Sequence, residues 1–184
     1  MKLLMPVYVF GASAMLVACG GGEVGGTISG LTADGLTLSN GTETIVVVSG
    51  STSFSFPTLV DDGKTYSVVV VTQPGGLQCT VTNGSGTASA NVDVSDVAIN
   101  CVPVWPLSGT VNGLQQAGLV LSNGTQSINV APLASSFAFP GLLVQGASYA
   151  VTVTRQPLPQ SCGVTNGTGT VDAAPVANVA ITCK

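Results

Sequence analysis

Length, composition and charge already exclude several classes of function. The chain has 184 residues, only 7% of them charged, no His and a formal net charge of −4. It therefore cannot neutralise a nucleic-acid backbone, and it lacks both the commonest general base and the commonest transition-metal ligand. Its 24 Gly and 5% aromatic residues indicate short strands and tight turns rather than long helices.

Residues 1–18 have the pattern of a secretory signal peptide. Met1-Lys2 is a short positive start, and an apolar stretch runs from Leu3 to Ala18. The stretch is shorter than the roughly 20 apolar residues that a spanning helix needs, so it predicts an export signal. An N-terminal anchor that is never cleaved is the alternative.

The residues Leu16-Val17-Ala18-Cys19 close this signal, and three Gly follow them. They resemble the lipobox of bacterial lipoproteins. The resemblance implies that Cys19 receives a diacylglycerol, that cleavage occurs just before it, and that the freed amine is acylated. Because Gly20 is not an Asp, it also implies the outer membrane of the cell envelope as the default destination. Residues 19–25 are then the lipidated Cys and a flexible tether.

The cysteine count supports lipidation. Five Cys is an odd number, and a leftover Cys in an exported protein needs an explanation. A lipidated Cys19 leaves four that can pair in an oxidising compartment. We therefore expect Cys79, Cys101, Cys162 and Cys183 to be structural rather than redox-active or metal-binding.

The rest of the chain consists of two tandem copies of one sequence module. Gly26-Thr27 recurs as Gly109-Thr110, 83 positions later. The same offset relates Phe54-Ser55-Phe56-Pro57 to Phe137-Ala138-Phe139-Pro140, Tyr66 to Tyr149, Gln73-Pro74 to Gln156-Pro157, and Cys79 to Cys162. An almost gapless register of this length predicts two complete domains of about 80 residues, over 26–101 and 107–184, rather than a solenoid.

Within each copy, apolar and polar residues alternate with a period of two. Leu36-Thr37-Leu38 is an example, and such alternation buries one face of a strand. The Val runs at 46–48 and 68–71 favour interior strands. Tight turns are marked by Asn-Gly pairs, which formally match glycosylation sequons but are better explained as turns, at Asn40, Asn83, Asn123 and Asn166. Roughly seven strands per copy at this spacing predict an antiparallel sandwich.

The stretch Phe54-x-Phe56-x-x-Leu59, followed by Gly63-x-x-Tyr66-x-Val68-x-Val70, resembles two families. One comprises carboxypeptidase-regulatory-like and transthyretin-like domains with the B-type repeats of collagen-binding adhesins, and the other is the fibronectin type III domains. The second copy repeats the pattern at Phe137, Phe139, Leu142, Gly146, Tyr149, Val151 and Val153. The resemblance implies an all-β chain of two tandem immunoglobulin-like or transthyretin-like antiparallel β-sandwiches. Physically, the alternation places both Phe rings on an inner face.

Four Cys permit three pairings. Only Cys79–Cys101 together with Cys162–Cys183 respects the repeat. Each bond would tie the last strand of its module to an earlier strand and contribute on the order of 3 kcal/mol.

Residues 102–106 form a Pro- and Trp-containing linker between the copies, which we expect to be extended and semi-rigid. Trp105 is the only Trp. An exposed indole at this position could stack on a sugar, which makes Trp105 a possible ligand contact. Its place at the junction, outside any repeated loop, instead favours packing between the two modules.

Carboxylates are the remaining candidates for chemistry. Asp61 and Asp62 are adjacent, and Asp93 and Asp96 precede Cys101. Such groups could bind calcium together with carbonyl oxygens, but the second copy has no counterpart of the adjacent pair, so solvated turns are favoured. We expect no enzyme, no cofactor and no metal.

The sequence thus predicts a lipid-anchored protein of the cell envelope with a structural, spacer or adhesive role. Its expected partners are the membrane, reached through the N-terminal lipid, and an envelope or surface protein or glycan. The alternative is a glycan- or protein-binding module on the bacterial surface that uses the sandwich loops or Trp105.

Overall fold

The computed structural model describes residues 20–184 and shows an all-β chain. The signal-peptide prediction for residues 1–18 and the lipidation prediction for Cys19 lie outside the described residues. Within residues 20–184, no helix is long and apolar enough to cross a membrane. The predicted all-β fold class with two tandem β-sandwiches is confirmed.

The strands follow the repeat. The first repeat contains β1 (Val24–Ser29), β2 (Leu36–Asn40), β3 (Glu43–Val47), β4 (Ser53–Ser55), β5 (Thr65–Thr72), β6 (Leu77–Thr82) and β7 (Ser85–Thr87). The strand β8 (Val94–Asn112) belongs to both repeats. The second repeat adds β9 (Leu119–Asn123), β10 (Gln126–Val130), β11 (Ser136–Val144), β12 (Ser148–Arg155), β13 (Cys162–Thr165), β14 (Thr168–Thr170) and β15 (Val176–Cys183).

Each repeat consists of two sheets that face each other across a core. In the first repeat the sheets have the orders β6-β8-β1-β4 and β3-β2-β5-β7. The second repeat has the equivalent sheets β13-β15-β8-β11 and β10-β9-β12-β14. The period-two sequence produces this arrangement directly: in β5, Tyr66 and Val68 are buried, whereas Ser67 between them is exposed.

One pairing in each repeat departs from the purely antiparallel arrangement that the sequence predicted. β1 runs parallel to β8, with Ile28 opposite Ile99, and β8 runs parallel to β15, with Val111 opposite Ile181. The first and last strands of each repeat are therefore neighbours that run in the same direction. Parallel neighbours cannot be joined by a short hairpin, so local turn signals give no sign of this pairing.

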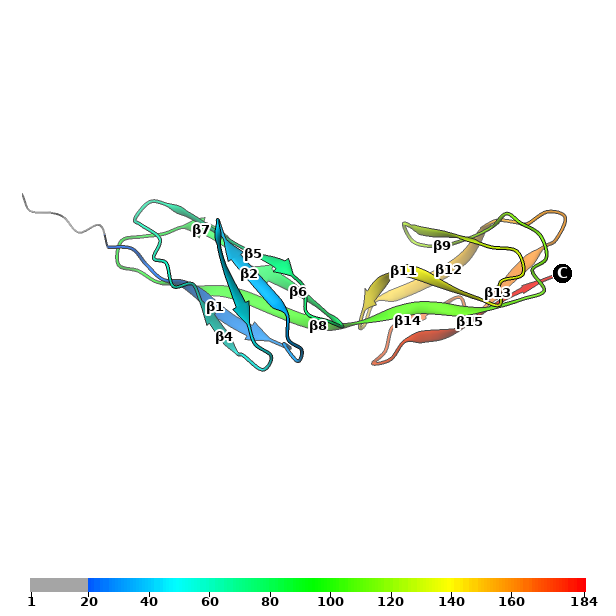
Figure 1. Ribbon diagram of the computed structural model, residues 1–184, viewed down its shortest axis with the longest axis horizontal. Coiled ribbons are helices and arrows are strands. Elements are labelled where there is room, and N and C mark those ends of the chain that lie inside the picture. The colour runs from blue at the N-terminus through cyan, green and yellow to red at the C-terminus, as the bar shows by residue number, and fades with distance from the viewer. Residues whose placement is uncertain (1–19) are drawn as a thin grey trace, which may run out of the picture.

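The strand β8 passes through both repeats without a break (Figure 1). Its first part pairs with β6, where Cys101 faces Cys79, and its second part pairs with β11, where Trp105 faces Leu143. Residues 102–106 are therefore part of one strand rather than a separate linker. The repeats lie end to end, and the described chain begins at one end of an elongated molecule and finishes at the other.

Each repeat has its own hydrophobic core. The two Phe rings of a repeat pack edge to face, with centroids 6.0 Å apart for Phe54 and Phe56 and 5.9 Å apart for Phe137 and Phe139. All four rings are buried, which confirms the prediction that they lie on the inner face. Edge-to-face geometry adds a favourable contact beyond the burial of ring area.

The Gly-rich segment before β1 is packed against the first repeat, so the prediction of a flexible tether is wrong for residues 20–25. The Gly22 N–H donates to the Val60 carbonyl at 3.0 Å, and the Val60 N–H donates back at 2.9 Å. The Gly20 carbonyl accepts the Asn91 N–H at 3.4 Å. A Cβ at Gly22 would collide with the Val92 carbonyl oxygen. Glycine is needed here for close backbone approach, not for flexibility.

Candidate functional site

Trp105, the possible ligand contact, packs onto the core of the second repeat. Its side chain is half-buried and lies against that core together with Leu143, its partner across the β8–β11 pairing. Its indole N–H is buried without a hydrogen-bond partner among the described residues. The structure therefore places this ring as a packing group of the second repeat, rather than as a free stacking surface or a wedge between the two cores.

Two of the four calcium candidates accept hydrogen bonds from backbone N–H groups. Asp62 accepts the Ala90 N–H at 2.9 Å, and Asp93 accepts the Glu23 N–H at 2.8 Å. Over residues 20–184 there is no group of three or more His, Cys, Asp or Glu side chains that could hold a metal ion. The structure thus does not bring the four possible calcium ligands of the sequence analysis, Asp61, Asp62, Asp93 and Asp96, together into one site.

Asp34 is the acidic residue whose pKa is clearly shifted. Its carboxylate accepts the Ser49 N–H at 2.8 Å. This backbone hydrogen bond, together with one from the Ser49 side chain, holds the pKa of Asp34 below its ordinary value of 3.8, because both bonds favour the ionised form. The equivalent residue in the second repeat is Ala117, so this interaction is not duplicated.

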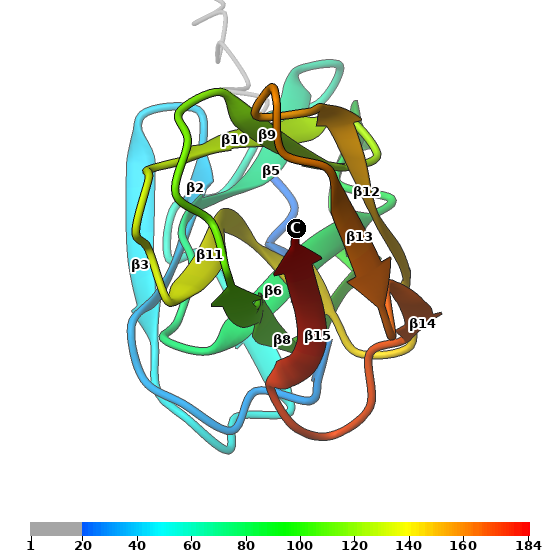
Figure 2. The ribbon, with the colours of Figure 1, turned by 90° about the vertical axis from the view of Figure 1, so that its right-hand side faces the viewer.

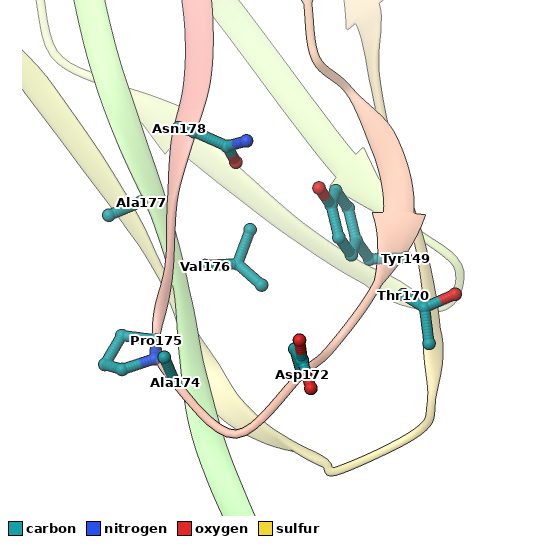
Figure 3. Close-up of a pocket in the computed structure, with 8 residues that line it drawn as sticks. All are labelled: Tyr149, Thr170, Asp172, Ala174, Pro175, Val176, Ala177 and Asn178. Atoms are coloured by element: carbon teal, nitrogen blue, oxygen red, sulfur yellow. The ribbon is translucent and has the colours of Figure 1, made fainter.

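An open hollow of about 490 Å³ lies beside the loop between β14 and β15 (Figure 3). Tyr149 approaches it from β12, and Asp172 and Pro175 belong to the loop itself. Asp172 is the only carboxylate that lines the hollow, and it accepts the adjacent Ala173 N–H at 2.9 Å. General acid–base chemistry uses titratable groups with separated pKa values, and a lone solvated carboxylate does not supply such a pair.

Both within-repeat disulfides are present. Cys79 on β6 lies opposite Cys101 on β8, and Cys162 on β13 lies opposite Cys183 on β15. The bonds span 22 and 21 residues, and all four Cys are buried. Each disulfide joins the last strand of its repeat to the edge strand beside it.

A pair of glutamine clamps accompanies the disulfides, and the sequence analysis did not predict them. The Gln73 side-chain oxygen accepts the Cys79 N–H at 2.7 Å, and its side-chain amide donates to the Cys79 carbonyl at 3.0 Å. Gln156 makes the same two bonds to Cys162, at 2.7 and 3.1 Å. The duplicated Gln-Pro pair was the visible signal. Its meaning required the tertiary structure, because the Gln side chain occupies the free edge of a strand.

The repeated Asn-Gly sequences make tertiary hydrogen bonds as well as turns. Asn40 accepts the Ser67 N–H through its side-chain oxygen at 2.9 Å, which joins the β2–β3 hairpin to β5, and Asn123 makes the equivalent bond at 2.8 Å. Asn83 and Asn166 themselves adopt positive φ angles of 56° and 55°. All four Asn residues therefore have structural roles, which supports their interpretation as turn residues rather than glycosylation sites.

The Val runs produce an exposed apolar surface in the first repeat. Val46 is 73% exposed, Val48 66%, Val69 47% and Val71 57%. The prediction of interior strands is wrong for the run at 46–48, because β3 is the edge of its sheet, and is confirmed for the run at 68–71, because β5 lies between β2 and β7. The four side chains are exposed because a strand turns every second residue outward whatever its composition. We call this set, on the outer side of the β3-β2-β5-β7 sheet, the valine face.

The second repeat provides a natural comparison for the valine face. At the four equivalent positions it has Asn129, Ala131, Thr152 and Thr154, which are polar or small. Thr152 shares a side-chain hydrogen bond with Ser122 at 3.1 Å. The same sheet surface is therefore apolar in one repeat and polar in the other, although the backbone architecture is shared.

No family model matches the chain, and no curated protein matches its sequence. Among solved structures, the C-terminal fragment of the pilus adhesin SpaC from Lactobacillus rhamnosus GG aligns with 88% of this chain and 95% of that chain, at 11% identity and a TM-score of 0.35. A mutant of the shaft pilin SpaA from the same organism aligns with 89% and 98%, at 12% identity and a TM-score of 0.31. These scores are too low to transfer function.

Proposed function

We propose that this chain is a lipid-anchored, non-catalytic protein of the cell envelope that acts as a load-bearing structural spacer or adhesive stalk. The proposed anchor is Cys19, and the proposed destination is the outer membrane. The observation that carries the proposal is the pairing of the first and last strands of each repeat.

In each repeat the chain enters and leaves through parallel, paired strands. Tension applied at the two ends of the molecule pulls β1 and β8 in opposite directions along their common axis, and it does the same to β8 and β15. The hydrogen bonds between such strands lie across the direction of force, so several must break together. Because β8 is shared, the two parallel pairs form one continuous load path along the molecule.

The N-terminal end of the described chain supports close anchoring. Gly20 and Gly22 are already bonded to the first repeat, and Cys19 is one Cα step, about 3.8 Å, from Gly20. A lipid on Cys19 would therefore hold the first repeat directly at the membrane surface, and the second repeat would project beyond it. The packed position of Trp105 makes sugar stacking by this ring a weaker alternative.

Single-molecule force spectroscopy tests the load-bearing role. With the chain held at its two ends, we expect two unfolding steps at similar forces, one for each repeat. The disulfide withholds 22 residues in the first repeat and 21 in the second, so chemical reduction should lengthen each step by roughly 70 Å at about 3.4 Å per residue. Gradual extension without resolved steps would contradict a load-bearing role.

Intact mass spectrometry of the exported protein tests the anchor separately. We expect an acylated N-terminal Cys19 in the wild type and retention of an unacylated chain in Cys19→Ala. An unmodified Cys19 thiol in exported wild-type protein would overturn the lipid anchor, while leaving the mechanical result intact.

A further inference from the structure

The two most exposed leucines of the described chain lie at the end of the molecule that is far from Gly20. Leu133 is 80% exposed in the loop between β10 and β11, and Leu158 is 79% exposed in the loop between β12 and β13. Figure 2 looks onto this end, where the chain end marked C faces the viewer. We call this end the distal tip, and it comprises the loops 113–118, 131–135 and 156–161 with Arg155 and Lys184 beside them.

Hydrogen bonds join the loops of the distal tip to one another. The Leu133 N–H donates to the Leu114 carbonyl at 3.0 Å. The Gln160 side chain accepts the Gln115 N–H at 2.8 Å and donates to the Gly113 carbonyl at 2.7 Å. Because Leu114 and Gln115 are adjacent, one segment connects the loop that carries Leu133 to the loop that carries Gln160. Both exposed leucines therefore belong to one surface.

The backbone of Leu133 is unfavourable for a leucine. Its φ angle is 64°, in the left-handed region that bulky residues rarely adopt. The equivalent residue of the first repeat is Gly50, with a φ of 80° and the same hydrogen bond, from its N–H to the Leu31 carbonyl at 2.8 Å. Glycine adopts this conformation without steric cost. Since the Leu133 side chain is also exposed, folding does not account for it, and such a strained residue points to function.

The first repeat lacks both leucines at its corresponding end. There, Gly50 takes the place of Leu133, and Gly75 takes the place of Leu158. A Cβ at either glycine would meet no atom within 4 Å, so lack of space does not explain the difference. Among the described residues, the apolar side chains are therefore present only at the end of a repeat that is not joined to another repeat.

The distal tip also carries the cationic side chains of the second repeat, which are Arg155 and Lys184. The Arg155 Nε–H donates to the Gly118 carbonyl at 3.1 Å. The Lys184 N–H donates to the Ser161 carbonyl at 2.9 Å. Both residues are thus held beside the leucine-bearing loops. Their equivalents in the first repeat are uncharged, namely Thr72 and Val102.

The acidic residue of the second repeat lies at its other end. Asp172 is the only acidic residue among positions 107–184. Its neighbour Val171 accepts the Gly146 N–H at 2.8 Å, and Gln145 donates to the Pro103 carbonyl of the junction at 2.9 Å. The loop of Asp172 is therefore next to the junction. The distal tip combines exposed leucines with cationic side chains and has no acidic side chain.

This combination favours a lipid surface that carries negative charge. Leucines that are about four-fifths exposed project from the tip, and a protein partner would need pockets that match both of them. A bilayer interface is fluid and closes around projecting apolar side chains without a matching pocket. Binding to such an interface grows with the apolar area inserted and with the attraction between cationic side chains and anionic lipids.

We propose that the distal tip docks onto an anionic lipid surface. Leu133 and Leu158 enter the interfacial region of the bilayer, and Arg155 and Lys184 lie beside the headgroup phosphates. This inference rests on the adhesive form of the proposed function and names its partner. With Cys19 anchored in one membrane, the elongated chain presents the tip to a second membrane. The contact of one copy is small, so many copies on one surface bind together.

Vesicle capture tests the proposal. The full chain is attached densely to a streptavidin surface through a biotin at its amino end, which leaves the distal tip free. We expect vesicles of equal parts phosphatidylglycerol and phosphatidylcholine to be captured on the order of tenfold more than vesicles of phosphatidylcholine alone, because each cationic side chain is attracted to an anionic surface. Added salt should reduce this difference by screening the charges.

Leu133→Gly and Leu158→Gly should each lower capture of the anionic vesicles by about tenfold, because each removes one inserted side chain. The urea midpoint of Leu133→Gly should stay at the wild-type value, since Gly50 shows that the fold accepts glycine here. Lys184→Gln should lower capture of the anionic vesicles and leave capture of the neutral vesicles unchanged.

Leu59→Gly is the matched control. Leu59 is 56% exposed in the segment between β4 and β5, at the end of the molecule that is attached to the surface. The same substitution there should leave capture unchanged. Equal losses for Leu59→Gly and Leu133→Gly would rule out the distal tip as the docking site. A wild type that captures no anionic vesicles would rule out the lipid partner.

The result is separate from the two tests of the proposed function. The biotin replaces the lipid, so vesicle capture does not depend on modification of Cys19. Force spectroscopy needs no vesicles, so it measures load bearing whether or not the distal tip binds lipid. Loss of capture together with intact unfolding steps and an acylated Cys19 would therefore reject the docking proposal alone.

Discussion

At the scale of single residues, small side chains in this protein make room for large ones across the strands. Gly86 lies opposite Tyr66, and Gly169 lies opposite Tyr149. A Cβ at either Gly would meet the Tyr ring. The second Gly of each Asn-Gly-x-Gly sequence is therefore a packing requirement rather than a turn residue, and the Tyr ring covers the gap that glycine leaves in the sheet.

Asp34 gives a prediction for the pH dependence of stability. Its folded-state pKa is lowered from 3.8 by the hydrogen bonds from Ser49. The stabilisation is therefore present above the unfolded-state pKa and is lost as the pH falls through the folded-state pKa. We expect the urea midpoint to fall on acidification below about pH 5, and Asp34→Ala should remove part of that fall.

Carbon-detected NMR titration of the Asp34 carboxyl group checks the cause directly. The wild-type pKa should lie below 3.8. Asp34→Ala gives the first repeat the residue that the second repeat has at Ala117, so the variant is compatible with the fold. A pKa at or above the ordinary value would show that the Ser49 hydrogen bonds do not favour the carboxylate.

At the scale of elements, the two repeats differ in the residues found at the edges of their sheets. The glutamine clamps fill the edges of β6 and β13 at Cys79 and Cys162 in the same way. The edges β3 and β10 are treated differently, because only β10 has Asn129 and a nearby Pro132. The two repeats therefore share their strand pairing and their core, whereas the exposed edge strand is apolar in the first repeat only.

The disulfides give a prediction at this scale. Replacing both Cys79 and Cys101 by Ala removes the constraint on a 22-residue segment and should lower the free energy of unfolding of the first repeat by about 3 kcal/mol. The matched double substitution of Cys162 and Cys183 should cost the second repeat a similar amount, because its segment is 21 residues. Urea denaturation measures both. A loss below about 0.5 kcal/mol would show that the Gln clamps and sheet pairing suffice.

At the scale of the whole molecule, β8 decides how the repeats are joined. The junction is bonded on both sides, since the Val104 N–H donates to the Gly76 carbonyl at 3.0 Å and the Gln145 N–H donates to the Pro103 carbonyl at 2.9 Å. The Pro residues of this segment tolerate an extended conformation. The joint is consequently a paired strand, and this accounts for the end-to-end shape of the molecule (Figure 1).

Substitution of Trp105 tests which of the two repeats this residue of the junction stabilises. Because the ring packs onto the core of the second repeat, Trp105→Ala should destabilise that repeat by about 2 kcal/mol, less than full burial of a Trp would cost. Hydrogen exchange followed by mass spectrometry should show faster exchange in β9–β15, while β1–β7 remain unchanged. Equal acceleration in both repeats would instead mean that the ring couples the two modules.

The sequence predicted those features that depend on local pattern or on repetition. Phe54 and Phe56 are buried because alternation alone assigns them to one face. The pairing of Cys79 with Cys101 could be chosen from three possibilities because a duplicated fold must pair its Cys alike. The same reasoning failed for Val46, because composition favoured an interior strand and only the sheet order shows that β3 is an edge.

By itself the sequence determined the all-β class, the duplication and the positions of the turns, since each of these follows from residues that are close in the chain or repeated at a constant offset. The tertiary structure alone decided that β1 and β15 run parallel to β8, that residues 102–106 continue a strand, and that β3, which carries Val46, is the edge of its sheet. These features depend on which distant strands become neighbours. Local periodicity carries no information about that choice, because an alternating strand satisfies its inner face equally well in an edge, central, parallel or antiparallel position.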